Sequence, residues 1–331
     1  SHWLFEQARA DGIDCLHFLS REGKIMKAVY DAWVEGLPGA PRSQYAVLSR
    51  RSSSMAALSS FEEIIDIAKT NYFTNTFGKM VQTRYGISPS QEKWQEVRSL
   101  SGYSADTLIE IQNKKIGNLR EALRSLEPEI MRQSQAERDA MRLYLRSAGF
   151  PEDSKPAVVD VGYGGTVQGH LNKILAKPVH GYYFMTEDRA SAVIKRYGVR
   201  LRACFIDQID TTVSLPLLFW RSFDLEKLLS SNDPQIEYYE MEAGQVIGHY
   251  RPLADEELAA SEIKNQIQLG ALQYTADLRE IRQTLLPDFR PSCFVATSLL
   301  HAFLTNQSDA EIALLSSIVL DDYYCGRDLV A

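Results

Sequence analysis

One stretch of the sequence, 156–171, combines a single aspartate, a glycine-rich turn and a helix start, and reads PAVVDVGYGGTVQGHL. The small and β-branched residues around Asp160 are typical of a buried parallel strand, which would place this carboxylate at the carboxyl edge of a sheet. Three of the next five residues are glycine, so backbone N–H groups can approach an anion, and Thr166 adds a hydroxyl at the next helix start. The pattern predicts a phosphate-binding turn, although ordinary strand-to-helix turns also contain glycine.

Two further predicted strands end in a serine followed by an arginine. The apolar run 13–19 breaks into SREGK, the run 45–48 breaks into SRR, and an amphipathic helical pattern at 25–33 lies between them. In open α/β sheets ligands bind beyond the carboxyl ends of the strands, so we expect both Ser-Arg pairs to meet the glycine turn in one crevice. The alternative is that these arginines are solvated at the surface, as most arginines are.

The residues of these three loops are the candidate substrate-binding residues. A guanidinium group binds phosphate oxygens in pairs, so the arginines rank above the lysine as anion ligands. The candidates are Ser20, Arg21, Gly23, Lys24, Ser49, Arg50, Arg51, Gly162, Tyr163, Gly164, Gly165 and Thr166.

Composition and charge exclude several protein classes. The net charge of −7 across 331 residues argues against non-specific binding to nucleic acid or to an anionic membrane. No apolar run approaches the roughly 20 residues that span a bilayer. The four cysteines form no CxxC pair and are expected to be reduced thiols, neither zinc ligands nor a disulfide framework. These features are typical of a soluble cytosolic protein. The chain lacks a signal peptide and an initiating Met, so we expect it to be cut from a longer protein or to carry residues left by cloning.

The hydrophobic periodicity predicts an α/β core, a helical insertion and a helical C-terminal region. Strand patterns resume at 157–161, 180–185 and 203–206, and a hairpin with a turn at 242–244 is expected over 235–250. Residues 61–146 show helical periodicity with no strand signal, as does the chain from 255 onward. We expect three units, namely an α/β core at 1–54 and 151–250, a helical insertion that caps the crevice at 55–150, and a helical C-terminal region at 251–331.

Several other polar or aromatic residues have ordinary structural explanations. His17 lies inside an apolar strand and is expected to be a core histidine. The run 215–220 is expected in the core, and Asp321-Asp322 as a helix-end or solvated pair. Glu226 stays undecided between surface and site.

The three loop sequences carry a resemblance to a known group of proteins. FLSREG at 18–23, VLSRRS at 47–52 and VDVGYGGTVQ at 159–168 resemble the region that follows a haloacid-dehalogenase-like phosphatase domain in large bacterial proteins of surface polysaccharide assembly. The glycine turn is also similar to the phosphoribosyl-pyrophosphate loop of phosphoribosyltransferases, and the Ser-Arg turn after the first strand to their pyrophosphate loop. The family loop carries two adjacent acidic residues, whereas here Val159 precedes the single Asp160.

The resemblance implies a parallel Rossmann-like sheet of phosphoribosyltransferase type and a glycan phosphoribosyltransferase. Such an enzyme moves ribose 5-phosphate from phosphoribosyl pyrophosphate to a sugar hydroxyl in O-antigen or capsule biosynthesis, and a phosphatase domain in the parent protein or pathway then leaves ribofuranose. Mg²⁺ and fixed cations would stabilise the pyrophosphate leaving group. The candidate catalytic residues are Asp160, Glu22 and Arg21, and no residue is assigned as a metal ligand.

Some alternatives stay open. Asp160 can instead cap the glycine turn, and Glu22 can be a surface carboxylate paired with an arginine. At the level of function, the alternatives are a glycosyltransferase that uses a nucleotide-sugar and a non-catalytic scaffold that binds a nucleotide or glycan. The expected location is cytoplasmic or peripheral at the inner membrane face, with no transmembrane segment and no nucleic acid partner.

Overall fold

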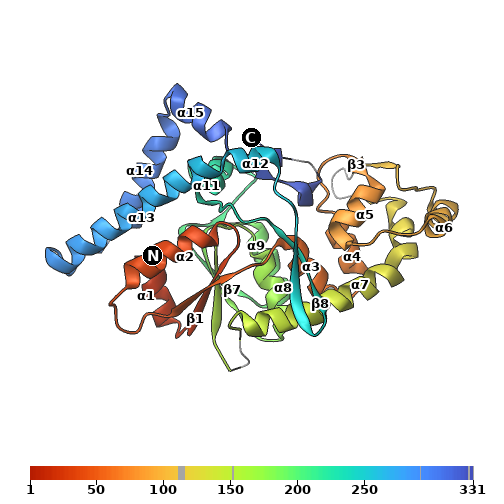
Figure 1. Ribbon diagram of the computed structural model, residues 1–331, viewed down its shortest axis with the longest axis horizontal. Helices are drawn as coiled ribbons and strands as arrows, with labels where there is room; N and C mark the ends of the chain where they lie inside the picture. The colour runs from red at the N-terminus through yellow and green to blue at the C-terminus, as the bar shows by residue number, and fades with distance from the viewer. Residues whose placement is uncertain (111–115, 151–152, 291, 327–328, 331) are drawn as a thin grey trace.

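A five-stranded parallel sheet lies at the centre of the computed structural model (Figure 1), which describes residues 1–110, 116–150, 153–290, 292–326 and 329–330. The strand order is β2-β1-β5-β6-β7, and every neighbouring pair is parallel. This confirms the predicted α/β class with a parallel sheet. The strands are β1 (Cys15–Leu19), β2 (Arg42–Ala46), β5 (Pro156–Asp160), β6 (His180–Glu187) and β7 (Arg200–Ile209).

The direction of strand addition reverses beside β1. The chain passes from β1 to β2 on one side and, after the insertion, returns to β5 on the other side. Phe18 of β1 is therefore paired with Tyr45 of β2 and with Val159 of β5. The loops that leave β1 and β5 diverge to opposite faces at such a switch point, which is the usual ligand site of an open α/β sheet.

Side chains of the central strands alternate between two hydrophobic cores. Leu16 and Phe18 belong to the core that includes residues of α1 and α2, whereas Val158 belongs to the core that includes residues of α3 and α8. His17 is fully buried with its ring stacked on Phe150, which confirms it as a core histidine. The helices around the sheet are α1 (His2–Ala10), α2 (Gly23–Val34), α3 (Arg50–Ala57), α8 (Thr166–Leu175) and α9 (Arg189–Tyr197).

The insertion forms a separate lobe with its own hydrophobic core, drawn in orange and yellow in Figure 1. The prediction that it contains no strand was wrong in detail, because two short segments pair as β3 (Asn75–Thr76) and β4 (Leu108–Ile109). Two residues per strand are too few to show a period of two in the sequence. The helices of the lobe are α4 (Phe61–Ala68), α5 (Phe77–Tyr85), α6 (Gln91–Ser101) and α7 (Leu119–Ser147).

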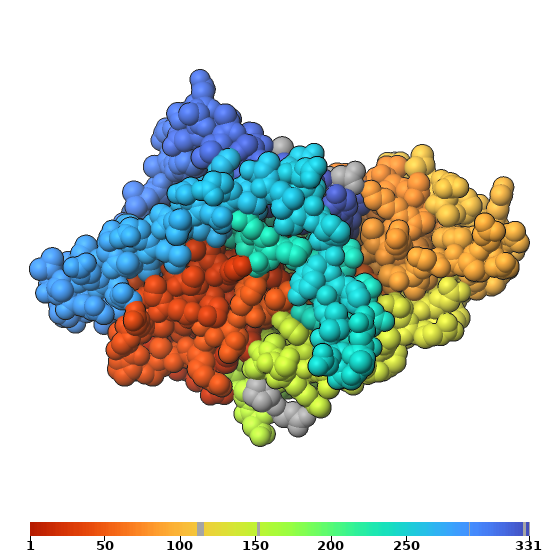
Figure 2. Space-filling view, viewed as in Figure 1, coloured from red at the N-terminus to blue at the C-terminus, as the bar shows by residue number. Residues whose placement is uncertain are grey.

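The C-terminal part of the chain wraps over the core. The space-filling view shows the light-blue helix α13 (Ser261–Thr284) lying over the red and orange N-terminal residues (Figure 2). The predicted hairpin forms from β8 (Ile236–Glu242) and β9 (Gln245–Tyr250) with its turn at Ala243-Gly244. The remaining elements are α10 (Leu217–Trp220), α11 (Ser222–Leu229), α12 (Asp255–Ala259), α14 (Cys293–Thr305), α15 (Asp309–Ser316), β10 (Leu320–Asp321), η2 (Tyr323–Cys325) and β11 (Leu329–Val330).

The structure bears on two predictions, the absence of a membrane-spanning helix and the state of the cysteines. Within the described ranges, no helix has both the length and the apolar character needed to cross a bilayer. The cysteines are all free thiols in the structure, but the fold brings the sulfurs of Cys204 and Cys293 to 3.5 Å from each other. Burial, the main cause, and the neighbouring Cys293 raise the pKa of the Cys204 thiol to about 12.

Candidate functional site

A cavity of about 410 Å³ opens beyond the carboxyl ends of β1 and β5. We call it the switch-point cavity. The loops after β1, β2 and β5 all contribute to its wall, as the crevice rule predicts. Eleven of the residues singled out in the sequence line it, namely Ser20, Arg21, Glu22, Ser49, Arg50, Asp160, Gly162, Tyr163, Gly164, Gly165 and Thr166.

Backbone conformation and close packing require glycine at two positions of the glycine turn, in addition to its place at the cavity. Gly165 has φ +70°, a left-handed conformation that side chains disfavour, and a Cβ there would lie 3.0 Å from Leu201. A Cβ on Gly162 would lie 2.7 Å from the carbonyl oxygen of Met185. A Cβ on Gly164 would make only ordinary van der Waals contacts, the nearest at 3.6 Å from Glu187. The turn ends directly in α8, whose first backbone N–H groups are therefore at the cavity wall, where they suit an anion.

Three of the predicted substrate-binding residues do not line the switch-point cavity, and each has a structural reason. A Cβ on Gly23 would lie 2.6 Å from the backbone of Phe18, so glycine allows α2 to start close against β1. The Lys24 ammonium forms an exposed ion pair of 2.6 Å with Asp233. The sequence does not show the Lys24 contact, because Asp233 is 209 residues away.

Arg51 is the clearest of these corrections. Its guanidinium donates two hydrogen bonds, of 2.6 and 2.8 Å, to the carboxylate of Glu137 on α7, and both side chains are buried. Arg51 therefore ties α3 to the insertion. The adjacent Arg50 points to the other side, into the cavity.

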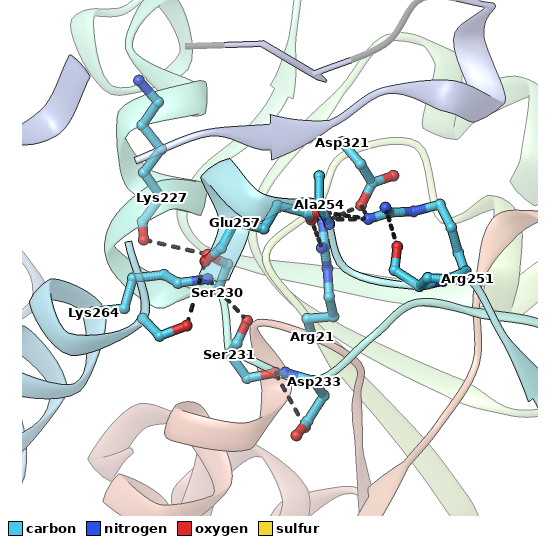
Figure 3. A network of polar contacts seen from close by, with 12 residues as sticks. Arg21, Lys227, Ser230, Ser231, Asp233, Arg251, Ala254, Glu257, Lys264 and Asp321 are labelled. Carbon is cyan, nitrogen blue, oxygen red and sulfur yellow. Dashed lines mark hydrogen bonds and ion pairs between the residues drawn. The ribbon is translucent and has the colours of Figure 1, made fainter. Parts of the chain in front are cut away.

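Arg21 lines the cavity but is already paired with acidic side chains (Figure 3). Its guanidinium lies 2.7 Å from Asp321 and 3.5 Å from Glu257, and Arg251 contacts the same two carboxylates at 3.4 and 2.8 Å. The two acidic side chains are only 3% exposed. The prediction that Asp321 is a helix-end or solvated residue was therefore wrong, because the Asp321 side chain is buried and the residue lies in β10. This network fixes the loop after β1 to α12 and β10.

Arg50 is the cation of the cavity that remains available. It is the first residue of α3, it is exposed, and among the described residues it makes no ion pair with a carboxylate. Its guanidinium lies 5.6 Å from the ring centre of Tyr324. Burial and the charge of Glu22 raise the pKa of the Asp160 carboxyl, and the positive charge of Arg50 opposes this rise.

The two serines of the Ser-Arg pairs hold the loops in place. The Ser20 hydroxyl donates to the carbonyl of Leu48 at 2.8 Å and accepts from the Leu48 N–H at 3.0 Å. The Ser49 hydroxyl accepts from the Ser52 N–H at 3.0 Å and so caps α3. Together they connect the ends of β1 and β2 and aim the start of α3 at the cavity.

Three carboxyl groups gather in the same cavity. Asp160 and Glu226 are half-buried, and burial is the main cause that raises both pKa values. The neighbouring charge of Glu22 is the second cause in both cases. The pKa of Glu226 is raised to about 7. A carboxyl with such a pKa can accept and release a proton near neutral pH.

Glu226, which the sequence left undecided between surface and site, lines the cavity. It lies on α11, one helical turn from Phe223 and from Leu229, so an acid shares a face with apolar residues. That pattern was a signal, but nothing local indicates that α11 reaches the glycine turn. Phe219, expected in the core, likewise lines the cavity, and its ring packs edge-on against Tyr163 at 5.2 Å.

Asp160 also makes one local contact. Its carboxylate accepts a hydrogen bond of 2.8 Å from the Val161 N–H at the start of the glycine turn. This contact belongs to the turn-capping alternative, while the position in the cavity belongs to the catalytic one, so the structure accommodates both roles.

The carboxylates also bear on whether a divalent cation would fit. Mg²⁺ prefers hard oxygen ligands and is usually held by one or two carboxylates together with substrate phosphates. Glu22 and Asp160 supply such oxygens beside the loops, and their mutual repulsion is what a cation would relieve. A separate group, Glu240, Glu242 and His249, has ligand atoms within 4.8 Å of one another, but it lies on the hairpin and not in the cavity wall.

Comparison with known proteins assigns the chain to no family. No protein-family model matches the chain, and no curated protein matches it.

Proposed function

We propose that the protein is a glycan phosphoribosyltransferase that moves ribose 5-phosphate from phosphoribosyl pyrophosphate to a sugar hydroxyl. The observation that carries the proposal is the meeting of three strand-end loops in one cavity at the switch point. Two of these loops run into the helix starts of α3 and α8, and the third runs into α2. Helix N-termini favour anions, so the cavity suits a donor with phosphate groups at both ends.

The donor would lie across the cavity. Its 5-phosphate would bind at the start of α8, where Gly164, Gly165 and Thr166 line the wall. Its pyrophosphate would extend toward the loop after β1 and toward Arg50. Arg21 would contribute through the network that shapes this loop, since its charge is balanced by Asp321 and Glu257.

The chemistry requires a group that accepts a proton. The bond between C1 of the ribose and the pyrophosphate oxygen breaks, pyrophosphate leaves with the electron pair, and the acceptor oxygen bonds to C1. The acceptor hydroxyl gives its proton to a carboxylate, and we assign this role to Glu226 or Asp160, which both line the cavity. A pKa of about 7 makes Glu226 well suited to this task. Mg²⁺ bound with the donor, near Glu22 and Asp160, would supply charge neutralisation for the leaving pyrophosphate.

The place of this reaction in a cell rests on the resemblance of the three loop sequences. A phosphatase in the same protein or pathway would remove the 5-phosphate from the product and leave ribofuranose on an O-antigen or capsule glycan. The donor is a cytoplasmic metabolite, which favours a cytoplasmic protein or one peripheral at the inner membrane face.

A transfer assay tests the proposal. The protein is incubated with Mg²⁺ and phosphoribosyl pyrophosphate labelled in the ribose, together with bacterial glycan acceptors, and both pyrophosphate release and labelled glycan are measured. The expected result is label in the glycan and its loss in Arg50→Ala. Label from a nucleotide-sugar and none from phosphoribosyl pyrophosphate would instead identify a conventional glycosyltransferase, and no transfer from either donor would favour the scaffold.

A further inference from the structure

A second cavity of about 290 Å³ adjoins the switch-point cavity, between α3 and α4 on one side and α8 and α9 on the other. We call it the side groove. Its volume is near the lower end of small-molecule sites, about 300 Å³. Six residues line both cavities, namely Arg50, Tyr163, Gly164, Thr166, Arg189 and Tyr324. A molecule in the side groove would therefore reach the glycine turn.

Except for Arg50, at the border with the switch-point cavity, the charged residues of the side groove are paired with carboxylates or guanidinium groups. Arg196 on α9 bonds to Asp66 at 2.8 Å and to Glu63 at 3.4 Å, both on α4. Arg189 is likewise paired with Glu187. Away from Arg50, the wall thus presents carboxylates and guanidinium groups that neutralise one another and are held in place by contacts between α4 and α9. Such a surface suits a neutral ligand with many hydroxyl groups better than a phosphate.

Aromatic rings complete this wall. Tyr72, in the segment between α4 and β3, is 48% exposed although it carries a large ring. Tyr197 on α9 is half-buried, packs edge-on to His170 with ring centres 6.1 Å apart, and lies under the Arg196 guanidinium at 5.3 Å. The exposed ring of Tyr72 therefore offers an apolar face to the C–H face of a sugar ring, and the planar polar groups of the wall suit its hydroxyls.

We propose that the side groove binds the sugar acceptor, a neutral glycan whose reacting hydroxyl enters the switch-point cavity past Tyr163 and Arg189. The role of this glycan as the acceptor rests on the proposed function. The binding of a glycan in the groove is a separate property and can be measured without turnover. The insertion contributes α4 to the groove, so it would select the acceptor, while the sheet loops bind the donor.

The test fills the groove and leaves the donor loops unchanged. Ala192 is an exposed residue of α9 that lines the groove and not the switch-point cavity, so Ala192→Trp obstructs it. The matched control is Ser191→Trp, an exposed neighbour on the same helix that lines neither cavity. Tyr72→Ala removes the exposed ring. Binding of the methyl glycosides of glucose, galactose, mannose and rhamnose is followed by saturation-transfer NMR, with and without donor, and donor affinity by calorimetry.

We expect at least one glycoside to bind the wild type and Ser191→Trp, with affinity about tenfold or more weaker in Ala192→Trp and Tyr72→Ala, the loss that one good contact represents. Donor affinity should be equal in all four proteins. No glycoside binding to the wild type, or undiminished binding to Ala192→Trp, would overturn the inference, as would a groove that takes UMP or AMP instead. Loss of glycoside binding in Ala192→Trp without any donor binding would keep the glycan groove and refute the proposed transferase.

Discussion

Replacement of Glu226 by glutamine should make the protein more stable and less active. Glu226 has a pKa of about 7 in the folded protein against an ordinary value of 4.5, so the folded state holds its proton more tightly than the unfolded chain. Stability from this group is fully present below pH 4.5 and is lost as the pH rises through about 7. At pH 8 the loss is at most about 3 kcal/mol. Glutamine cannot ionise and should recover it.

The assay is urea unfolding of the wild type and Glu226→Gln at pH 4 and pH 8. We expect equal stability at pH 4 and a variant more stable at pH 8. Glu280→Gln, an exposed change on α13 away from the cavity, should show no such gain. If Glu226 is the base, wild-type transfer should rise about tenfold from pH 6 to pH 8, and the variant should lose about 10²-fold in turnover. A variant no more stable than the wild type at pH 8 would refute the buried position of this carboxyl.

Other substitutions separate the roles of the loop residues. Arg50→Ala should weaken donor binding by about 1.5 to 3 kcal/mol in calorimetry with an unchanged melting temperature. Arg21→Ala should destabilise the fold by about 3 kcal/mol in urea, because two buried carboxylates lose a partner, and a stable variant would contradict the network. Asp160→Asn should lower turnover about 10²-fold with folding intact, whereas a lower melting temperature with normal specific activity would make Asp160 a turn cap. Gly165→Ala should cost about 1 to 2 kcal/mol, while Gly164→Ala should be nearly neutral in thermal unfolding.

The parts of the site that the sequence predicts are those next to strand ends. The β1 and β5 loops combine an apolar run with an abrupt polar break, and the switch-point rule then places them together. Strand β2 was predicted at 45–48 but runs from Arg42 to Ala46, because its exposed edge residues alternate and carry little apolar signal. The loop that follows it was still placed correctly.

The parts that the sequence does not predict depend on contacts between distant segments. Whether an arginine faces a ligand or a structural partner is decided by residues such as Glu137 and Asp321, which are far along the chain. Arg50 and Arg51 are adjacent and chemically identical, yet one lines the cavity and the other anchors the insertion. The same reason left Glu226 undecided between surface and site, since no local pattern shows where α11 packs.

The most direct test of the central claim is isothermal titration of the wild-type protein with phosphoribosyl pyrophosphate and, separately, with UDP-glucose, each with and without Mg²⁺. The account predicts that phosphoribosyl pyrophosphate binds, more tightly with Mg²⁺, and that UDP-glucose binds weakly or not at all. Tight binding of UDP-glucose with no heat from phosphoribosyl pyrophosphate would contradict the account, and so would the absence of binding by both.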